Sequence, residues 1–342
     1  MHKTLVLVVF SVLLSLNITA CRDGRKQNHN NNMVKTYDCS VVKGVSLPIN
    51  EDRGGHAGGV VDGKIIIVGG NRWSEDKGTK FFLSDALIFD DHTWVKGPEL
   101  PEPIANPMFG SDSSGLYIAG GTSDGVVMSE KVFVLRSIST RSRWERLPDL
   151  PEGVGLGAGA IVNGSFYVSG GTLNNGKRTN KMWALTLSDP EAGWRECEPI
   201  PGVERMLHAF VGDRGSLYLL GGLAETSPLT PLNDMYRYDC LSGKWEILAD
   251  LPEKGYAWVA QPIDEANVLI TGKADGQIHS GVWMLDLETS QMETVGDLVI
   301  QSTTAPLIHV SRNEWWLVGG EPDSKKNRTR EVSIIKLISK KL

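Results

Sequence analysis

One loop near the C-terminus contains two residue types that suit acid–base chemistry on an anionic ligand. Glu321 directly follows a pair of glycines, and Arg328 follows seven residues later in the same polar stretch. A carboxylate can act as a general base, and a guanidinium can bind a carboxylate through two parallel hydrogen bonds. An acid in such a loop is more often only a solvated surface residue. Whether Glu321 has a chemical role therefore depends on how the surrounding elements position it.

The familiar signatures of other catalytic classes are absent. The sequence has neither a Gly-x-Ser-x-Gly nucleophile elbow nor a His-Glu-x-x-His zinc helix. The glycine-rich run 153–159 precedes a β-rich stretch rather than a helix, so we expect close packing there and no nucleotide. The histidines at 56, 208, 279 and 309 are scattered, and each is expected to be structural. The sequence thus predicts no metal and no cofactor.

A repeat of about 50 residues organises most of the chain. Six β-rich runs end in Gly-Gly or a remnant of it, at intervals of 51, 50, 51, 50 and 48 residues. A tryptophan follows the glycines four times, and a proline follows each tryptophan by seven residues. This pattern resembles the Kelch repeat, whose unit is one four-stranded blade of a β-propeller. We therefore predict an all-β, six-bladed Kelch propeller. The marker glycines are Gly70, Gly121, Gly171, Gly222, Gly272 and Gly320.

The two ends of the chain are predicted to share the last blade. The sixth repeat ends after a strand at 332–337, before an outer strand can form. Residues 41–48 match residues 94–101 in register, and the latter contain the outer strand of the first blade. The N-terminal segment should therefore complete the last blade and close the ring without leaving an unpaired edge.

This architecture predicts which side chains share a face of the ring. Because strands alternate in direction, the loop after each Gly-Gly pair and the turn before each inner strand emerge on one face. Binding residues are expected on such loops, held by the rigid ring. Among the six residues that follow the glycines, Glu321 is the acid. Arg53 and Arg205 precede inner strands, so they should lie on its face, with Arg53 in the neighbouring blade.

The propeller resembles the Kelch-type sialic-acid mutarotase (N-acetylneuraminate epimerase) family. The similarity is carried by three segments, and most usefully by the Gly-Glu pair that Arg328-Thr329 follows after a short spacer. Blades three and four resemble the first two blades of the better-known members, so this chain is similar to a cyclically permuted member. The segments are 55–70, 167–171 and 217–238.

The resemblance implies an isomerase that interconverts the α and β anomers of N-acetylneuraminate without a cofactor. Glu321 would be the base, and Arg328 would anchor the substrate carboxylate or stabilise charge; Arg53 and Arg205 would help bind the substrate. General acid–base help of this kind is typically worth about 10²–10⁴-fold. Two alternatives remain: a non-enzymatic Kelch module that binds glycan or protein, and another sugar enzyme such as a sialidase.

The N-terminus predicts export as a bacterial lipoprotein. An apolar run at 5–16 is too short to span a bilayer but suits a signal peptide, and Ile18-Thr19-Ala20-Cys21 resembles a lipobox. We expect a signal peptide at 1–20, lipidation of Cys21, a polar tether at 21–35 and the propeller at 36–342. The mature protein should then reside in the periplasm or at the outer membrane, with the lipid as its membrane contact. Loss of fatty-acid labelling in Cys21→Ala would check this expectation.

Charge and cysteine content narrow the remaining possibilities. The formal net charge is −6, and the excess of acids lies in 36–342, so the body lacks the basic surface of a nucleic-acid binder. None of the cysteines forms a Cys-x-x-Cys pair, which argues against zinc and thioredoxin-type sites. Export permits a disulfide, but the sequence cannot choose a pairing among Cys39, Cys197 and Cys240.

Overall fold

The computed structural model describes residues 37–226 and 228–339, which fold almost entirely as β-strands. The predicted signal peptide, Cys21 and the tether lie outside these residues. Within them, the only helix is the short 3₁₀ turn η1 (Pro190–Ala192). The described part contains no helix that is long and apolar enough to cross a membrane.

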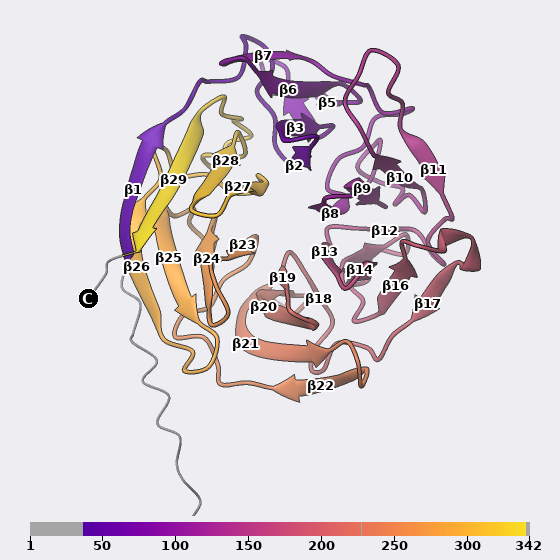
Figure 1. The fold of residues 1–342 in the computed structure, drawn as a ribbon, viewed down its shortest axis with the longest axis vertical. Helices are drawn as coiled ribbons and strands as arrows, with labels where there is room; N and C mark the ends of the chain where they lie inside the picture. Colours follow the sequence, from indigo (N-terminus) through magenta and orange to yellow (C-terminus); the bar gives the residue numbers. More distant parts are fainter. Residues whose placement is uncertain (1–36, 227, 340–342) are drawn as a thin grey trace, which may run out of the picture.

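Antiparallel sheets are arranged around a common axis, and the described residues form a six-bladed propeller as predicted (Figure 1). In the first five blades the strands run from the axis to the rim in chain order. Blade one contains β2 (Ala57–Val61), β3 (Lys64–Val68), β6 (Ala86–Asp90) and β7 (Thr93–Lys96). Blade two contains β8 (Met108–Asp112), β9 (Gly115–Ala119), β10 (Val132–Leu135) and β11 (Glu145–Leu147). Blade three contains β13 (Ala158–Val162), β14 (Ser165–Ser169), β16 (Met182–Thr186) and β17 (Trp194–Glu196).

The second half of the ring repeats this plan. Blade four contains β19 (Ala209–Asp213), β20 (Ser216–Ala224), β21 (Thr230–Asp239) and β22 (Lys244–Ile247), with β18 (Arg205–Met206) added beside β20. Blade five contains β23 (Val259–Pro262), β24 (Asn267–Thr271), β25 (Gly281–Asp286) and β26 (Met292–Asp297). Two small hairpins lie outside the blades: β4 (Asn71–Trp73) with β5 (Lys80–Phe82), and β12 (Val154–Gly155) with β15 (Thr172–Leu173).

Blade six joins the first and the last strand of the described residues, as the sequence predicted. It contains β27 (Leu307–Ser311), β28 (Glu314–Val318), β29 (Val332–Ser339) and, at the rim, β1 (Tyr37–Lys43). β1 pairs with β29 along its whole length, from Tyr37 opposite Ser339 to Lys43 opposite Ser333. In Figure 1 the indigo N-terminal strand lies beside the yellow C-terminal one. The ring is therefore closed by backbone hydrogen bonds.

The repeated tryptophans and glycines hold neighbouring blades together. The indoles of Trp94, Trp144, Trp194 and Trp245 each donate to a carbonyl of the preceding blade, at 2.8 to 2.9 Å. The acceptor of Trp94 is Val45, which follows β1, so this contact also confirms the predicted register. Gly320 donates its N–H to Arg53 at 2.8 Å, across the same junction. Its φ of 100° and the 2.3 Å from an ideal Cβ to Ser302 Oγ explain why glycine is required there.

Apolar side chains fill the space between blades rather than a single centre. One cluster joins Ile66 of blade one to Ile118 and Phe133 of blade two. Another joins Ile67 of blade one to Trp316 of blade six. Each blade therefore buries both faces against its neighbours, and an incomplete blade would expose one of them.

A ring of residues with left-handed backbone surrounds the axis on one side. One residue of each blade, just before its inner strand, has a φ between 52° and 63°. Around most of the ring, the N–H of one such residue donates to the carbonyl of its counterpart in the preceding blade, at 2.6 to 3.0 Å. This circular chain of hydrogen bonds fixes the loops on that face relative to one another. Its members are Gly55, Asn106, Leu156, Leu207, Ala257 and Thr304.

Candidate functional site

The structure brings Glu321 and Arg328 together on blade six. Backbone hydrogen bonds in both directions between Glu321 and Thr303, at 2.8 and 3.0 Å, hold the start of the loop. A further bond from the Thr329 N–H to the Gly320 carbonyl, at 2.9 Å, returns the loop to its origin. Arg328 consequently lies against Glu321, with 3.1 Å between Nη2 and Oε1. The described contacts leave the other carboxylate oxygen, Oε2, without a hydrogen bond.

The Arg328 guanidinium is buried and largely occupied by protein partners. Its side chain is 4% exposed, whereas that of Glu321 is 28% exposed. Nε and Nη2 donate to the backbone and side-chain oxygens of Asn71 at 3.3 and 2.7 Å, and Nη1 donates to Asn327 at 2.9 Å. Burial lowers the pKa of Arg328, and the Glu321 carboxylate opposes this shift. Arg328 is therefore placed to hold Glu321 in position rather than to offer both arms to a ligand.

Blade one supplies the other wall of the site through the hairpin β4–β5. Asn71 is buried and takes the position directly after the Gly-Gly pair, as Glu321 does in blade six. It is held by two backbone hydrogen bonds with Gly54, at 2.9 and 3.0 Å. Lys326 of the blade-six loop reaches the same hairpin, where its Nζ lies 4.2 Å from the centroid of the Trp73 ring.

Gly54 leaves room for the Glu321–Arg328 pair, which makes it a sensitive position. An ideal Cβ at Gly54 would lie 2.9 Å from Arg328 Cδ and Nε, and 3.0 Å from Glu321 Cγ. We expect Gly54→Ala to displace the pair, and any reaction that depends on the pair should slow by about tenfold or more, because misplacing reacting groups by about 1 Å can cost 10²-fold. Gly63→Ala is a control for backbone strain alone, since the φ of 73° at Gly63 disfavours a side chain although a Cβ there meets nothing within 4 Å. It should lower the melting midpoint and leave the rate unchanged. An unchanged rate in Gly54→Ala would contradict this role.

Arg53 and Arg205 lie close to the predicted face but are not available to a ligand. Both side chains are 0% exposed. Arg53 pairs with Asp85 at 2.9 Å and Glu51 at 2.6 Å, and Arg205 pairs with Asp234 at 2.5 Å. Burial raises the pKa of Asp85, but the Arg53 guanidinium outweighs it and brings that pKa down to about 2.

The two arginines occupy equivalent positions in blades one and four. Each donates to the carbonyl of the first glycine in the Gly-Gly pair of its own blade, Gly69 or Gly221, at 3.3 and 3.1 Å. The geometry therefore gives both arginines a structural role within their blades, and neither side chain is exposed for the substrate contact predicted from the sequence.

Blade three contains a partial copy of the site. Arg178 takes the position of Arg328, since Thr179 N–H donates to Gly171 at 3.0 Å as Thr329 does to Gly320. Its Nη1 donates to Thr172 Oγ1 at 3.0 Å, so a hydroxyl replaces the carboxylate of blade six. At the position after the glycines, blade three thus has a threonine where blade six has Glu321, while Arg178 Nε lies 3.9 Å from a carboxylate oxygen of Glu225 in blade four. Arg178 was not predicted from the sequence, although Arg178-Thr179 repeats the Arg-Thr pattern of blade six.

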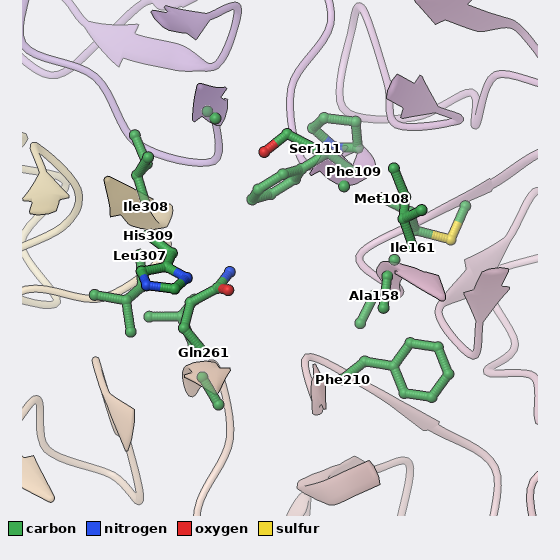
Figure 2. A pocket seen from close by; sticks show the side chains of 18 of the residues that line it. Met108, Phe109, Ser111, Ala158, Ile161, Phe210, Gln261, Leu307, Ile308 and His309 are labelled. Carbon is green, nitrogen blue, oxygen red and sulfur yellow. The ribbon is translucent and has the colours of Figure 1, made fainter. Parts of the chain in front are cut away.

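A cavity of about 690 Å³ follows the propeller axis (Figure 2). Its wall combines apolar side chains such as Phe109 and Leu307 with the polar Gln261 and His309. The lining includes the left-handed ring but neither Glu321 nor Arg328. The Glu321–Arg328 pair therefore lies outside the lining of this cavity, beside Gly54, whose neighbour Gly55 belongs to that lining.

Two of the four histidines singled out from the sequence are buried, and a third stacks on a tryptophan. His56 and His208 are buried, and burial together with a nearby arginine lowers the pKa of each to about 3. His309 stacks on Trp315 with ring centroids 5.0 Å apart. Within residues 37–226 and 228–339, no group of three or more His, Cys, Asp or Glu side chains is placed to hold a metal ion.

The comparisons with known proteins confirm the predicted resemblance. Residues 147–284 match the family model described as N-acetylneuraminate epimerase, and residues 52–101 match the Kelch motif. The first match covers blades three and four and reaches into blade five, so it does not include Glu321 or Arg328.

Curated relatives are similar to this chain over about 100 residues. An N-acetylneuraminate epimerase of Haemophilus influenzae (strain PittEE) is 32% identical over 97 residues, which are 28% of this chain and 26% of the relative. An N-acetylneuraminate epimerase of Yersinia pestis (strain Pestoides F) is 28% identical over 109 residues, which are 30% of this chain and 28% of the relative. The alignments thus span about a quarter of the length of these relatives.

Proposed function

We propose that the protein is an isomerase that interconverts the α and β anomers of N-acetylneuraminate. The observation that carries the proposal is the Glu321–Arg328 pair, in which one carboxylate oxygen is held at 3.1 Å and the other is left for a ligand. The matches to N-acetylneuraminate epimerases support the choice of substrate and reaction. The partial exposure of Glu321 allows a sugar to reach it from solvent.

Anomerisation of a cyclic hemiketal requires one proton to leave and another to arrive. Glu321 would remove the proton of the anomeric hydroxyl as the bond between the anomeric carbon and the ring oxygen breaks. The ring oxygen takes a proton from water, and the open-chain ketone rotates before the ring closes on the opposite face. The steps then run in reverse and return the proton from Glu321, so no net proton or electron is consumed. Arg328 would hold the Glu321 carboxylate in position throughout the reaction.

The proposal includes the place of action. The predicted lipidation of Cys21 would tether the propeller outside the cytoplasm, where sialidases release the α anomer before uptake. The exchange would supply the β anomer to that uptake step.

Anomer exchange followed by NMR tests this function directly. A sample enriched in the α anomer is added to the purified propeller, and the growth of the β signals is compared with buffer alone. We expect a clear acceleration at catalytic protein concentration. A rate equal to that in buffer, together with retained binding of the sugar, would leave a non-enzymatic binding module as the better description.

A further inference from the structure

A sugar acid bound at Glu321 needs a cation for its carboxylate. Arg53 and Arg205 are buried in ion pairs, and Arg328 donates hydrogen bonds to Asn71 and Asn327 while it pairs with Glu321. None of these guanidiniums can present a free two-armed fork without breaking protein contacts. Lys326 of the same loop lies over the Trp73 ring and donates to the Lys77 carbonyl at 3.4 Å. The remaining source of a free cation is the hairpin on the other side of the site.

The hairpin β4–β5 faces the site with a defined set of side chains. Its register places Asn71 opposite Phe82 and Trp73 opposite Lys80. Directly paired residues of antiparallel strands point to the same side, and alternate residues along a strand share a side. Because Asn71 bonds Arg328, the side chains of Trp73, Lys80 and Phe82 project on the side of the blade-six loop.

The remaining residues of this hairpin take the opposite side. Arg72 lies over Phe81, with its guanidinium carbon 5.8 Å from the ring centroid. Arg72 also donates to the Asn50 carbonyl at 2.7 Å, away from Glu321. Arg72 and Lys80, the cations of the two paired strands, thus lie on opposite sides of the hairpin, and Lys80 is the one on the side of the blade-six loop.

Lys80 has aromatic neighbours but no direct counter-charge. Its Nζ lies 5.2 Å from the ring centroid of Phe82 and 5.8 Å from that of Trp73. Among the described residues, no acid lies within ion-pair distance of it and no hydrogen bond is formed by its ammonium group. Burial and the Arg328 guanidinium lower the pKa of Lys80, whereas Glu321 raises it. The ammonium therefore lies within the field of the catalytic pair without being neutralised by it.

We propose that Lys80 is the anchor for the substrate carboxylate, across the space between hairpin β4–β5 and the loop 321–330. This inference rests on the proposed function and names the residue that makes the site selective for an anionic sugar. An ammonium group held against two aromatic rings is partly desolvated, so an ion pair formed there is stronger than one in open solvent. Trp73 and Phe82 would also supply an apolar wall for the sugar.

Titration calorimetry with N-acetylneuraminate and its methyl ester tests this assignment. The ester keeps the ring and the anomeric hydroxyl but removes the negative charge. We expect wild type to bind the acid more tightly than the ester, and Lys80→Met to weaken acid binding by about tenfold to a hundredfold, as for loss of a charged hydrogen bond. Ester binding should hardly change. In the anomer assay, KM should rise in Lys80→Met much more than kcat falls.

Two further variants separate charge from structure. Lys80→Arg keeps the charge and should retain most of the preference for the acid. Lys77→Met removes a cation near the tip of the same hairpin and should behave as wild type. If Lys80→Met binds the acid as wild type does, or if wild type binds acid and ester equally, the assignment is overturned; the second comparison needs no variant to fold.

The same experiment distinguishes this inference from the function on which it rests. If wild type shows a preference for the acid that depends on Lys80 but no faster anomer exchange, the isomerase proposal fails and the anion site stands. If exchange is fast but indifferent to Lys80, the site assignment fails and the isomerase proposal stands. Absence of any binding of the acid by wild type overturns the assignment of Lys80.

Discussion

Replacement of Glu321 by glutamine should slow anomer exchange by about 10²–10⁴-fold, the usual contribution of a general base. Glutamine has nearly the same shape and still offers an oxygen to Arg328, so the loop should keep its position. It cannot accept a proton from the anomeric hydroxyl at neutral pH. The measurement is the NMR exchange assay with purified protein, at matched concentrations of wild type and variant.

Controls for this substitution must distinguish loss of the general base from loss of one negative charge on this face of the ring. Glu75 is an exposed acid at the tip of hairpin β4–β5, so Glu75→Gln removes a nearby negative charge without touching the pair. Its exchange rate should equal that of wild type. A thermal melt of Glu321→Gln checks that the fold is retained. Equal rates in wild type and folded Glu321→Gln would remove Glu321 from the mechanism.

Deletion of residues 36–48 should destabilise the whole ring. The deletion removes β1 and leaves the outer edge of β29 unpaired. It also removes Leu47, which is 1% exposed, and the Val45 carbonyl that accepts from Trp94. Loss of a buried strand and a core leucine should cost several kcal/mol and lower the melting midpoint by about 10 °C or more, relative to a chain that begins at residue 36.

A matched substitution and a peptide sharpen the truncation experiment. Val42 lies in β1 with 46% of its surface exposed, so Val42→Thr should keep the pairing and melt close to wild type. A synthetic peptide of residues 36–48 should bind the truncated ring by adding a strand, and should restore part of its stability. A truncated chain with the midpoint and cooperativity of wild type, and no affinity for the peptide, would contradict closure by β1.

The fold was predictable because one sequence pattern recurs in every blade. Six copies of one pattern fix the blade count, and the match of 41–48 to 94–101 fixes how the ring closes. The hydrogen bond from the Trp94 indole to the Val45 carbonyl confirms this match, because the other repeated tryptophans bond the preceding blade in the same way. The start of the outer strand at Tyr37 was less predictable, because strand ends depend on pairing with β29 rather than on the repeat.

The candidate site was predictable only in part. The position after the glycines placed Glu321, and the loop length placed Arg328, because both are properties of one blade. The fates of Arg53 and Arg205 depend on Asp85 and Asp234, which lie 32 and 29 residues further along the chain. Local pattern therefore indicated the face of these arginines but not their burial.

Lys80 was missed for a related reason. In the sequence, residues 71–82 have the composition of a polar loop. The structure shows that they pair into the hairpin β4–β5, with Trp73 opposite Lys80. The hairpin then contacts a loop about 250 residues later in the chain, through Lys326 and Lys77. No short-range signal in the sequence could report that contact.

The pairing of β1 with β29 also sets the order of events when the chain is made. The rim strand of blade six is among the first parts of the propeller to be synthesised, and its partner is the last. Inner strands of the earlier blades can pair as they appear, but blade six must wait until nearly the whole chain is available. Closure of so long a loop is entropically costly, and contacts so distant in sequence are associated with slow folding. Closure of the ring thus requires β29, and a chain that ends before β29 would retain an open ring.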